Sequence, residues 1–246
     1  MQDYRPPADL LKDRLVLITG AGGGIGGALA LACAAHGART VLLGHTVKKL
    51  EAVYDAIERI APDSAAILPC DLARGGLDQY EALAEAVAKE CGRIDGLVHT
   101  ATLLGVLSPL ELYPTDQSHQ SLRLNLYAPY LLTRACLPLL KKSRDASVVF
   151  TTADVGRRGR AYWGAYGIAQ FALEGMAQIW ADELETNTAV RVNTLDPGKV
   201  ATDFHAQAYP AADKTTLTTP QQIVNAYLYL LGADSAGVTG HAFNAQ

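Results

Sequence analysis

The chain has 246 residues and a mass of 26.1 kDa, and 49% of its residues are apolar, enough for one large core. Its net charge of −4 and pI near 5.8 give no electrostatic reason to expect a nucleic-acid partner. No stretch of about 18 uninterrupted apolar residues occurs, and the N-terminus lacks the apolar core of a signal peptide. We therefore expect a cytoplasmic protein without a membrane span.

The chain has four cysteines, which form no C-x-x-C pair, and six histidines, which form no H-x-x-x-H pair. Scattered cysteines of this kind are typical of buried thiols in a reducing compartment. We expect no disulfide and no metal site.

Short apolar segments alternate with helical patterns along the whole chain. Strands are expected at 14–19, 40–44, 65–69, 94–99, 147–151, 190–195 and 241–243. Helices are expected at 24–36, 48–60, 77–91, 115–141, 163–186 and 220–231. Strands alternating with helices predict βαβ units, hence an α/β fold with one doubly wound parallel sheet of Rossmann type and helices on both faces. No change in composition marks a boundary, so we expect a single domain over residues 1–246.

Two segments carry further expectations. Pro129 and Pro138 fall inside the helix expected at 115–141 and predict kinks or breaks there. Residues 199–219 form a polar stretch that is too long for an ordinary connection and predicts a functional loop such as a lid.

A glycine-rich run, Thr19-Gly-Ala-Gly-Gly-Gly-Ile-Gly26, lies where the first strand passes into the first helix. Glycines at such a turn let the backbone approach a pyrophosphate, and the helix N-terminus offers free N–H groups to it. Two registers fit, G-x-x-x-G-x-G from Gly20 and G-x-G-x-x-G from Gly22 to Gly27. The first is preferred because it begins at the strand end. The run predicts a nucleotide site rather than a turn alone.

Tyr166 and Gln170 are four residues apart, so they share one face of the helix expected at 163–186. This spacing suits a phenol that exchanges a proton and a lysine that lowers its pKa. The second position here is an uncharged amide.

The chain resembles the short-chain dehydrogenase/reductase family over nearly its full length. The resemblance rests on the order and spacing of Thr19-Gly20…Gly24-Ile-Gly26, Asp71, Asn125, Tyr166, Arg191-Val-Asn193 and Pro197-Gly198-Lys-Val-Ala-Thr202. It implies Tyr166 as the catalytic acid/base and Asn125 as the holder of a proton-relay water. It further implies a nicotinamide cofactor held by Gly20, Gly24, Ile25, Gly26, His45, Asp71, Ala101, Gln170, Pro197, Gly198 and Thr202.

The same resemblance exposes three departures. Thr100-Ala101-Thr102 stands where the family has Asn-Ala-Gly, and the Thr102 side chain is expected to crowd the cofactor ribose. The family's catalytic serine falls on Ala153 and its catalytic lysine on Gln170.

These departures have a chemical cost. A phenol has an ordinary pKa of about 10, and without an adjacent ammonium it is a poorly matched acid and a weak base near neutral pH. Losing a hydrogen-bond donor to a substrate carbonyl costs on the order of 3 kcal/mol. We expect little ordinary turnover.

Several neighbouring side chains are candidates to replace the missing serine and lysine. Asp154 lies on a loop and is free to turn inward, whereas Thr152 is expected to point to the opposite face of the sheet. Arg157, Arg158 and Arg160 favour a solvated or subunit-contacting loop over an anion-binding role. His99 is expected to be structural.

The cofactor form depends on the end of the second strand. An acid there would bond the adenosine ribose of NAD, but the chain has Gly44-His45. The partly charged imidazole favours NADP(H) over NAD(H).

Two functions remain open from the sequence. The first is an NAD(P)(H)-dependent oxidoreductase that interconverts carbonyls and alcohols, weakly or atypically. The second is a catalytically impaired nucleotide-binding protein that acts as a sensor, partner subunit or scaffold. In either case the resemblance implies a homodimer or homotetramer, paired through the helices around 115–141 and 163–186, where Leu131, Leu132, Phe171 and Ile179 exceed what one helix face needs.

Overall fold

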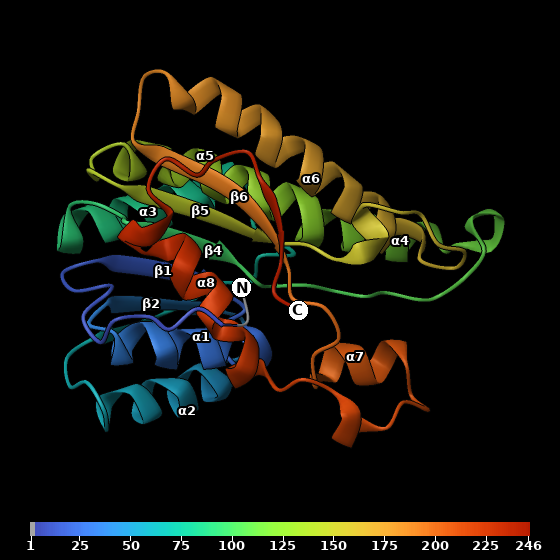
Figure 1. Ribbon diagram of the computed structural model, residues 1–246. Coiled ribbons are helices and arrows are strands. Elements are labelled where there is room, and N and C mark those ends of the chain that lie inside the picture. Colours follow the sequence, from blue (N-terminus) through green and yellow to red (C-terminus); the bar gives the residue numbers. More distant parts are fainter. Residues whose placement is uncertain (1–2) are drawn as a thin grey trace.

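The computed structural model describes residues 3–246 as a parallel sheet between two layers of helices (Figure 1). The strands are β1 (Leu15–Thr19), β2 (Arg39–Gly44), β3 (Ala65–Pro69), β4 (Gly96–His99), β5 (Ala146–Thr151), β6 (Val190–Asp196) and β7 (Ala242–Asn244). The main helices are α1 (Gly24–Ala35), α2 (Val47–Glu58), α3 (Leu77–Cys91), α4 (Thr115–Leu122), α5 (Ala128–Leu140), α6 (Gly164–Glu185), α7 (Asp203–Ala208) and α8 (Pro220–Leu231).

The seven strands are all parallel and lie in the order β3-β2-β1-β4-β5-β6-β7. The order reverses between β1 and β4, and in such sheets ligands bind outside the carboxyl ends of the strands at this point. The predicted doubly wound α/β fold is confirmed.

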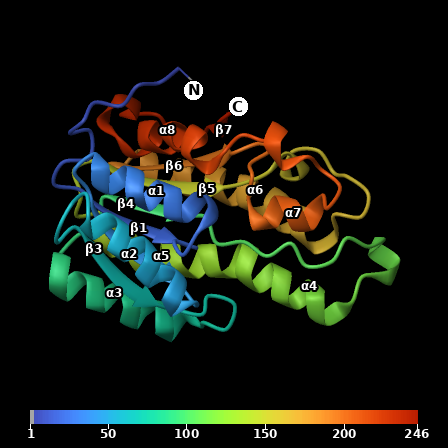
Figure 2. The ribbon, with the colours of Figure 1, turned by 90° about the horizontal axis from the view of Figure 1, so that it is seen from below.

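Each face of the sheet has its own apolar core, because successive side chains of a strand point to opposite faces. In β1, Val16 and Ile18 join the core under α1, α2 and α8, whereas Leu15 and Leu17 join the core under α3, α5 and α6. Figures 1 and 2 show the two helix layers on either side of the strands. Both faces are covered, which explains why the strands read as nearly continuous apolar runs.

The helix expected at 115–141 is interrupted. A π-helical turn, Arg123–Tyr127, joins α4 to α5. Pro129 lacks the N–H that would bond the Asn125 carbonyl in an α-helix, which accounts for the wider turn before it. Pro138 lies inside α5 and does not break it, and a kink at this residue stays a prediction.

The long segment 199–219 is more ordered than a plain loop. It contains α7 and a 3₁₀ turn, Lys214–Thr216, and Val200 forms a bridge with Thr218. Figures 1 and 2 place α7 beyond the carboxyl ends of the strands, and its Phe204 packs on Tyr166 near the start of α6.

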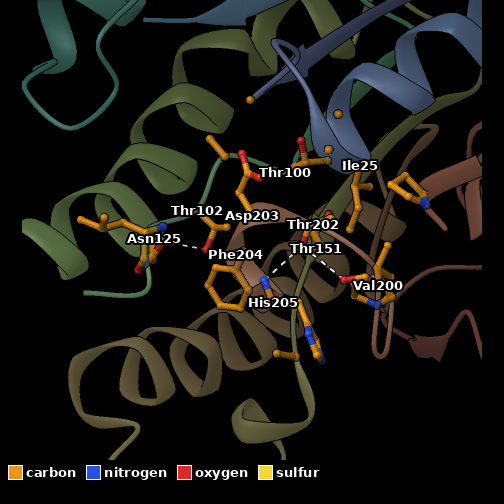
Figure 3. A pocket seen from close by; sticks show the side chains of 18 of the residues that line it. Ile25, Thr100, Thr102, Asn125, Thr151, Val200, Thr202, Asp203, Phe204 and His205 are labelled. Carbon is orange, nitrogen blue, oxygen red and sulfur yellow. Dashed lines mark hydrogen bonds between the residues drawn. The ribbon is translucent and has the colours of Figure 1, made fainter. Parts of the chain in front are cut away.

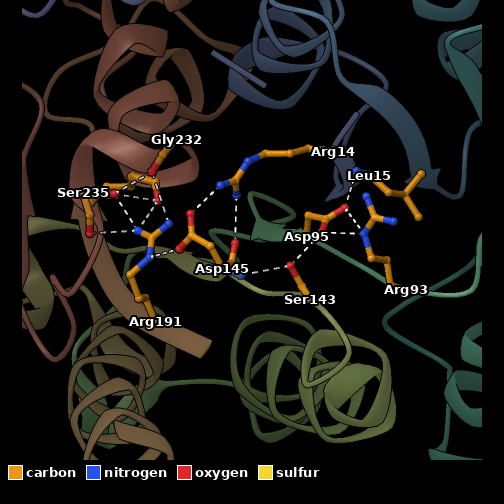
Figure 4. Close-up of polar contacts among 10 residues, drawn as sticks. Arg14, Leu15, Arg93, Asp95, Ser143, Asp145, Arg191, Gly232 and Ser235 are labelled. Carbon is orange, nitrogen blue, oxygen red and sulfur yellow. Dashed lines mark hydrogen bonds and ion pairs between the residues drawn. The ribbon is translucent and has the colours of Figure 1, made fainter. Parts of the chain in front are cut away.

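The amino ends of the strands hold a network of charged side chains (Figure 4). Arg191 donates through Nε to Asp145 Oδ1 at 2.8 Å and through its two terminal nitrogens to Ser235 and to the carbonyls of Leu230 and Gly232. Arg14 pairs with the other oxygen of Asp145. The Arg191-Val-Asn193 stretch of the family pattern is therefore structural.

A second carboxylate of this network is also fully used. Asp95 accepts hydrogen bonds from the Leu15 amide at 2.8 Å, from Ser143 at 2.7 Å and from Arg93 at 2.9 Å. Together the two carboxylates tie β1, β4, β5 and β6 at their amino ends.

The expectations on cysteines, metal sites and membrane spans concern side chains and helices within residues 3–246. Cys33, Cys70 and Cys136 are buried free thiols, while Cys91 is partly exposed. Within residues 3–246, no cluster of three or more histidine, cysteine, aspartate or glutamate side chains could hold a metal ion. None of the helices in that range is both long and apolar enough to cross a membrane.

Candidate active site

All thirteen site residues expected from the sequence line a single cavity of about 1580 Å³ at the carboxyl ends of the strands. They are Gly20, Gly24, Ile25, Gly26, His45, Asp71, Ala101, Asn125, Tyr166, Gln170, Pro197, Gly198 and Thr202. The cavity extends from the glycine-rich turn to α6 and α7. Its two ends differ in character.

The nucleotide end is built on the turn from β1 into α1. Gly20 has φ +67°, and a Cβ there would lie 2.8 Å from the Ala101 amide nitrogen. A Cβ on Gly26 would lie 2.4 Å from the Gly20 carbonyl oxygen. Helix α1 has no acid in its first turn and no side-chain cap, so its first amides face the cavity uncompensated. The turn fits a pyrophosphate.

Thr100 has a structural role at the nucleotide end of the cavity. The amides of Thr100 and Ala101 donate to Thr19 Oγ1 at 3.1 and 3.2 Å, and Thr100 Oγ1 donates to the Thr19 carbonyl. These bonds fix the carboxyl ends of β1 and β4 to each other.

Beyond β2, the cavity wall is basic and polar. Gly44, His45, Thr46 and Lys49 line it, and no acid follows β2 there. Sequence reasoning missed Thr46 and Lys49. The available signal was the pair Lys48-Lys49 in the first turn of α2, where the helix dipole disfavours cations.

Asp71, at the end of β3, lies at the rim of this wall. Its Oδ1 accepts the Ala73 amide at 3.0 Å, and its other oxygen lies 3.6 Å from Arg74. The carboxylate is half exposed, so it remains accessible to an adenine.

At the catalytic end, Tyr166 lies on the first turns of α6 and is only 5% exposed. Its ring packs against Phe204 and Trp163, with centroids 5.0 and 5.7 Å apart. Burial raises the pKa of Tyr166 above the ordinary phenol value, the nearby Thr102 hydroxyl partly offsets this rise, and the Asp196 and Asp154 carboxylates raise it further. The phenol is held neutral.

Gln170 lies one turn after Tyr166 and is 2% exposed. Its Oε1 is buried and has no hydrogen-bond partner in the described chain. Buried polar atoms are nearly always paired, so this orphan at a cavity wall indicates a missing ligand group. Ala153 lines the same cavity and offers only a methyl group.

Asn125 lies in the π-helical turn, and its side chain is fully occupied. Oδ1 accepts the Thr102 hydroxyl at 3.1 Å (Figure 3) and the Leu103 amide at 2.8 Å. Nδ2 donates to the Leu103 carbonyl and to Ser121. A proton-relay water held by Asn125 would have to hydrogen-bond the main chain of this residue. That role, and the crowding of a ribose by Thr102, stay predictions.

Two arginines of the loop that contains Arg157, Arg158 and Arg160 lie in different surroundings. Arg157 donates to Glu174 at 3.0 Å, which agrees with a structural reading. Arg160 instead lines the cavity, where it pairs with Asp154, donates to Tyr209 at 3.0 Å and lies over the Trp163 ring.

Two residues considered as substitutes have structural partners. Thr152 is buried and donates through its hydroxyl to Glu174 at 2.8 Å. His99 bonds Thr133 at 2.9 Å and stacks on Phe150, and burial lowers the pKa of its imidazole to about 3.

The segment that follows β6 forms another wall of the cavity. Gly198 has φ +73°, and Thr202 caps α7 by accepting the His205 amide at 3.2 Å. Phe204 and His205 turn toward the cavity from α7 (Figure 3). Sequence reasoning missed both, because only the polar character of 199–219 was visible.

Comparisons with known proteins agree with this geometry. The family model described as short chain dehydrogenase matches residues 14–213. The uncharacterised oxidoreductase YciK of Escherichia coli is 40% identical over 243 residues, covering 99% of this chain and 96% of that protein.

Two solved structures are similarly close. A proposed short-chain dehydrogenase from Pseudomonas syringae is 48% identical, with a TM-score of 0.97 and 99% of each chain covered. One from Shigella flexneri, solved in complex with NADP, is 40% identical, with a TM-score of 0.95, and the match covers 98% of this chain and all of that one. The chain belongs to the short-chain dehydrogenase family.

Proposed function

We propose that this protein is an NADP(H)-dependent oxidoreductase that reduces electron-poor carbonyl compounds slowly, with Tyr166 as the hydrogen-bond donor to the carbonyl oxygen. The observation that carries the proposal is the unpaired amide oxygen of Gln170 at the cavity wall, one turn from the buried Tyr166 phenol. A ribose hydroxyl is a donor that would satisfy this oxygen.

The choice of NADP(H) rests on the wall after β2. His45, Thr46 and Lys49 offer donors and positive charge to a 2′-phosphate, and no carboxylate follows β2 to bond a free ribose hydroxyl. The Shigella flexneri structure in complex with NADP supports the same form.

When bound, the reduced nicotinamide supplies a hydride to the carbonyl carbon. The chain's own part is to orient the carbonyl and to support the negative charge that develops on its oxygen. Tyr166 stays neutral because burial raises its pKa, and no lysine shares its helix face at position 170. The phenol donates a hydrogen bond to the carbonyl oxygen and gives up its proton as the alcohol forms, and water then returns a proton to the phenol. Because the phenol is a weak acid, this transfer is slow.

The low acidity of the Tyr166 phenol limits which carbonyl compounds can react. An electron-poor carbonyl, such as a diketone or quinone, places less charge on its oxygen and needs less help from an acid. Oxidation of an alcohol would require a phenolate base, which a raised pKa makes scarce. We therefore propose reduction as the favoured direction.

The second candidate is a nucleotide-binding protein without turnover. Three observations favour it: the methyl group of Ala153, the uncharged amide of Gln170, and the Phe204 ring packed on Tyr166. Such a protein would use the same nucleotide end as a sensor or partner subunit.

One experiment separates the candidates. Fluorescence titration with NADPH and NADH measures binding, and NADPH oxidation with cyclohexane-1,2-dione and a quinone measures turnover. Tighter binding of NADPH with slow turnover supports the first candidate. Binding alone supports the second, and no binding of either nucleotide defeats both.

We also propose that two or four copies assemble through α5 and α6. Phe171 and Ile179 are exposed, and Ile179 borders a groove with Tyr130, Gly175 and Trp180. Leu132 was wrongly assigned to this face, since it is fully buried in the core of its own chain. Light scattering that shows only a 26.1 kDa species at micromolar concentration would overturn the proposal.

A further inference from the structure

The catalytic end of the cavity has an aromatic wall made of side chains from two segments. Trp163 and Tyr166 come from the start of α6, whereas Phe204 and Tyr209 come from α7 and its C-terminal cap. All four line the cavity. The Trp163 ring lies 5.7 Å from Tyr166 and 5.9 Å from Tyr209, measured between centroids, and Phe204 lies 5.0 Å from Tyr166. The rings therefore form one continuous surface.

Tyr209 is the ring of this wall that keeps the most surface open. It is 38% exposed, whereas Trp163 and Tyr166 are 8% and 5% exposed. Because Tyr209 also lines the cavity, part of its open surface faces the space beside the Tyr166 phenol. An aromatic face is thus available to a ligand at the catalytic end.

The exposed ring of Tyr209 is held in place on every side. Its backbone amide donates to the His205 carbonyl at 2.8 Å, and its carbonyl accepts the Ala212 amide at 3.0 Å. Its hydroxyl accepts a hydrogen bond from Arg160 Nη1 at 3.0 Å, and the Arg160 guanidinium also lies over the Trp163 ring. A ring that is fixed in advance loses little conformational entropy when a ligand packs on it.

The positive charge beside this ring is already paired. Arg160 forms an ion pair with Asp154 through its other terminal nitrogen, and its guanidinium covers a face of Trp163. Arg160 is therefore occupied by Asp154, Tyr209 and Trp163 and is not a free receptor for an anion. The aromatic wall favours an uncharged ligand.

The cavity has room for such a ligand beside a dinucleotide. Its volume of about 1580 Å³ exceeds the roughly 300–1,000 Å³ that is typical of a site for one small molecule. Flat aromatic rings pack on aromatic side chains more favourably than their buried area alone would give, and aliphatic groups of similar size lack this gain. The fixed, open ring of Tyr209 thus favours a flat ligand.

We propose that the catalytic end takes an uncharged, flat aromatic dicarbonyl compound, and that Tyr209 selects it by stacking on its ring. The selection rests on the proposed reduction of electron-poor carbonyls and narrows their class to aromatic ones. Stacking requires no hydride transfer, so it is tested apart from turnover.

The binding test uses the emission of Trp163. The chain has two tryptophans, Trp163 and Trp180, so Trp163 is the sole reporter in a Trp180→Phe background. Three diones are titrated: phenanthrene-9,10-quinone, which is flat and aromatic; camphorquinone, which is apolar but not flat; and cyclohexane-1,2-dione, which is small and aliphatic. NADP⁺ is present throughout, so no dione is reduced. Free tryptophan amide corrects for absorption and collisional quenching.

Phenanthrene-9,10-quinone should quench Trp163 saturably and bind about tenfold tighter than camphorquinone. Tyr209→Leu should weaken the quinone roughly three- to tenfold and leave camphorquinone unchanged, whereas Tyr209→Phe keeps the ring and should retain most of the affinity. Tyr162→Leu is the matched control, because Tyr162 is 59% exposed but does not line the cavity. All variants are compared at equal NADP⁺ affinity and equal urea midpoints.

Turnover gives a second reading. With NADPH and without oxygen, Tyr209→Leu should raise KM for phenanthrene-9,10-quinone with little change in kcat, because Tyr166 rather than Tyr209 contacts the reacting oxygen. If no dione is reduced, the proposed function fails while the titrations still decide the stacking.

Three results would overturn the role of Tyr209. They are an absence of saturable quenching by any dione, equal affinities for phenanthrene-9,10-quinone and camphorquinone, and equal quinone affinities in the reporter background with Tyr209 and with Leu at that position. Should Tyr209→Leu fail to fold, the order of the three diones in the unchanged cavity still decides whether a flat aromatic ligand is preferred.

Discussion

The charged side chains at the amino ends of the sheet differ in their pairing from two buried side chains that line the cavity at the carboxyl ends. At the amino ends, Asp145 pairs with both Arg14 and Arg191, and Arg191 also donates to Leu230, Gly232 and Ser235. At the carboxyl ends, Gln170 Oε1 and His205 Nδ1 are buried at the cavity and have no partner within residues 3–246.

This difference separates stability from function within one fold. A buried charge is tolerated only when it is paired, so the complete network at the amino ends requires nothing from outside the chain. A buried polar atom without a partner costs free energy that a ligand can return. The carboxyl ends therefore carry the binding function.

The largest expected effect lies at the amino ends. Arg191→Met removes every bond of the buried guanidinium and should lower the free energy of unfolding by about 3 kcal/mol, measured by urea denaturation. Arg93→Met is the control, because Arg93 is half exposed and Asp95 keeps Leu15 and Ser143, so its cost should stay below about 1 kcal/mol. Equal stability of the two variants would contradict the contrast.

The next effect lies at the catalytic end. Ala153→Ser together with Gln170→Lys returns a carbonyl donor and a positive charge beside Tyr166, and should raise NADPH-dependent diketone reduction by about 100-fold. The groups act as a unit, so each single variant should recover far less than the pair. A double variant that binds NADPH but stays at the wild-type rate would show that the cavity has changed shape as well.

The same pair of variants predicts a change in pH dependence. The raised pKa of Tyr166 keeps the wild-type phenol protonated, so reduction should be flat from about pH 6 to 9. An ammonium at position 170 lowers that pKa, so the donor is lost as pH rises and the double variant should decline on the alkaline side. Parallel profiles would show that Tyr166 does not control the rate.

A smaller effect tests the nucleotide end. Lys49→Ala should weaken NADPH binding about tenfold and leave NADH binding nearly unchanged, since only NADPH carries the 2′-phosphate. Lys48→Ala is the matched control, because the neighbouring lysine does not line the cavity. Equal losses of affinity for NADPH and NADH in Lys49→Ala would show that Lys49 does not bind the 2′-phosphate.

The two ends of the cavity also differ in how far the sequence could predict them. The nucleotide end depends on backbone shape, and glycines such as Gly20 and Gly26 are visible in a sequence because no other residue fits their close contacts. The strand alternation predicted the sheet for a similar reason, since burial on both faces leaves a periodic trace.

The catalytic end depends on single side-chain contacts that no local pattern announces. Thr102 was interpreted as an obstacle to the ribose, and its hydrogen bond to Asn125 appears only when two separate segments come together. Phe204 belongs to a stretch with no clear helical pattern, so its packing on Tyr166 could not be predicted.

The most direct test of the account compares wild type and Tyr166→Phe in NADPH oxidation with cyclohexane-1,2-dione, after titration has shown that both bind NADPH equally. Removing the hydroxyl leaves the ring packing on Phe204 and Trp163 in place and deletes only the proposed donor. The account predicts a measurable wild-type rate and a loss of about 100-fold in kcat/KM for Tyr166→Phe. An active wild type with an equally active Tyr166→Phe would contradict it.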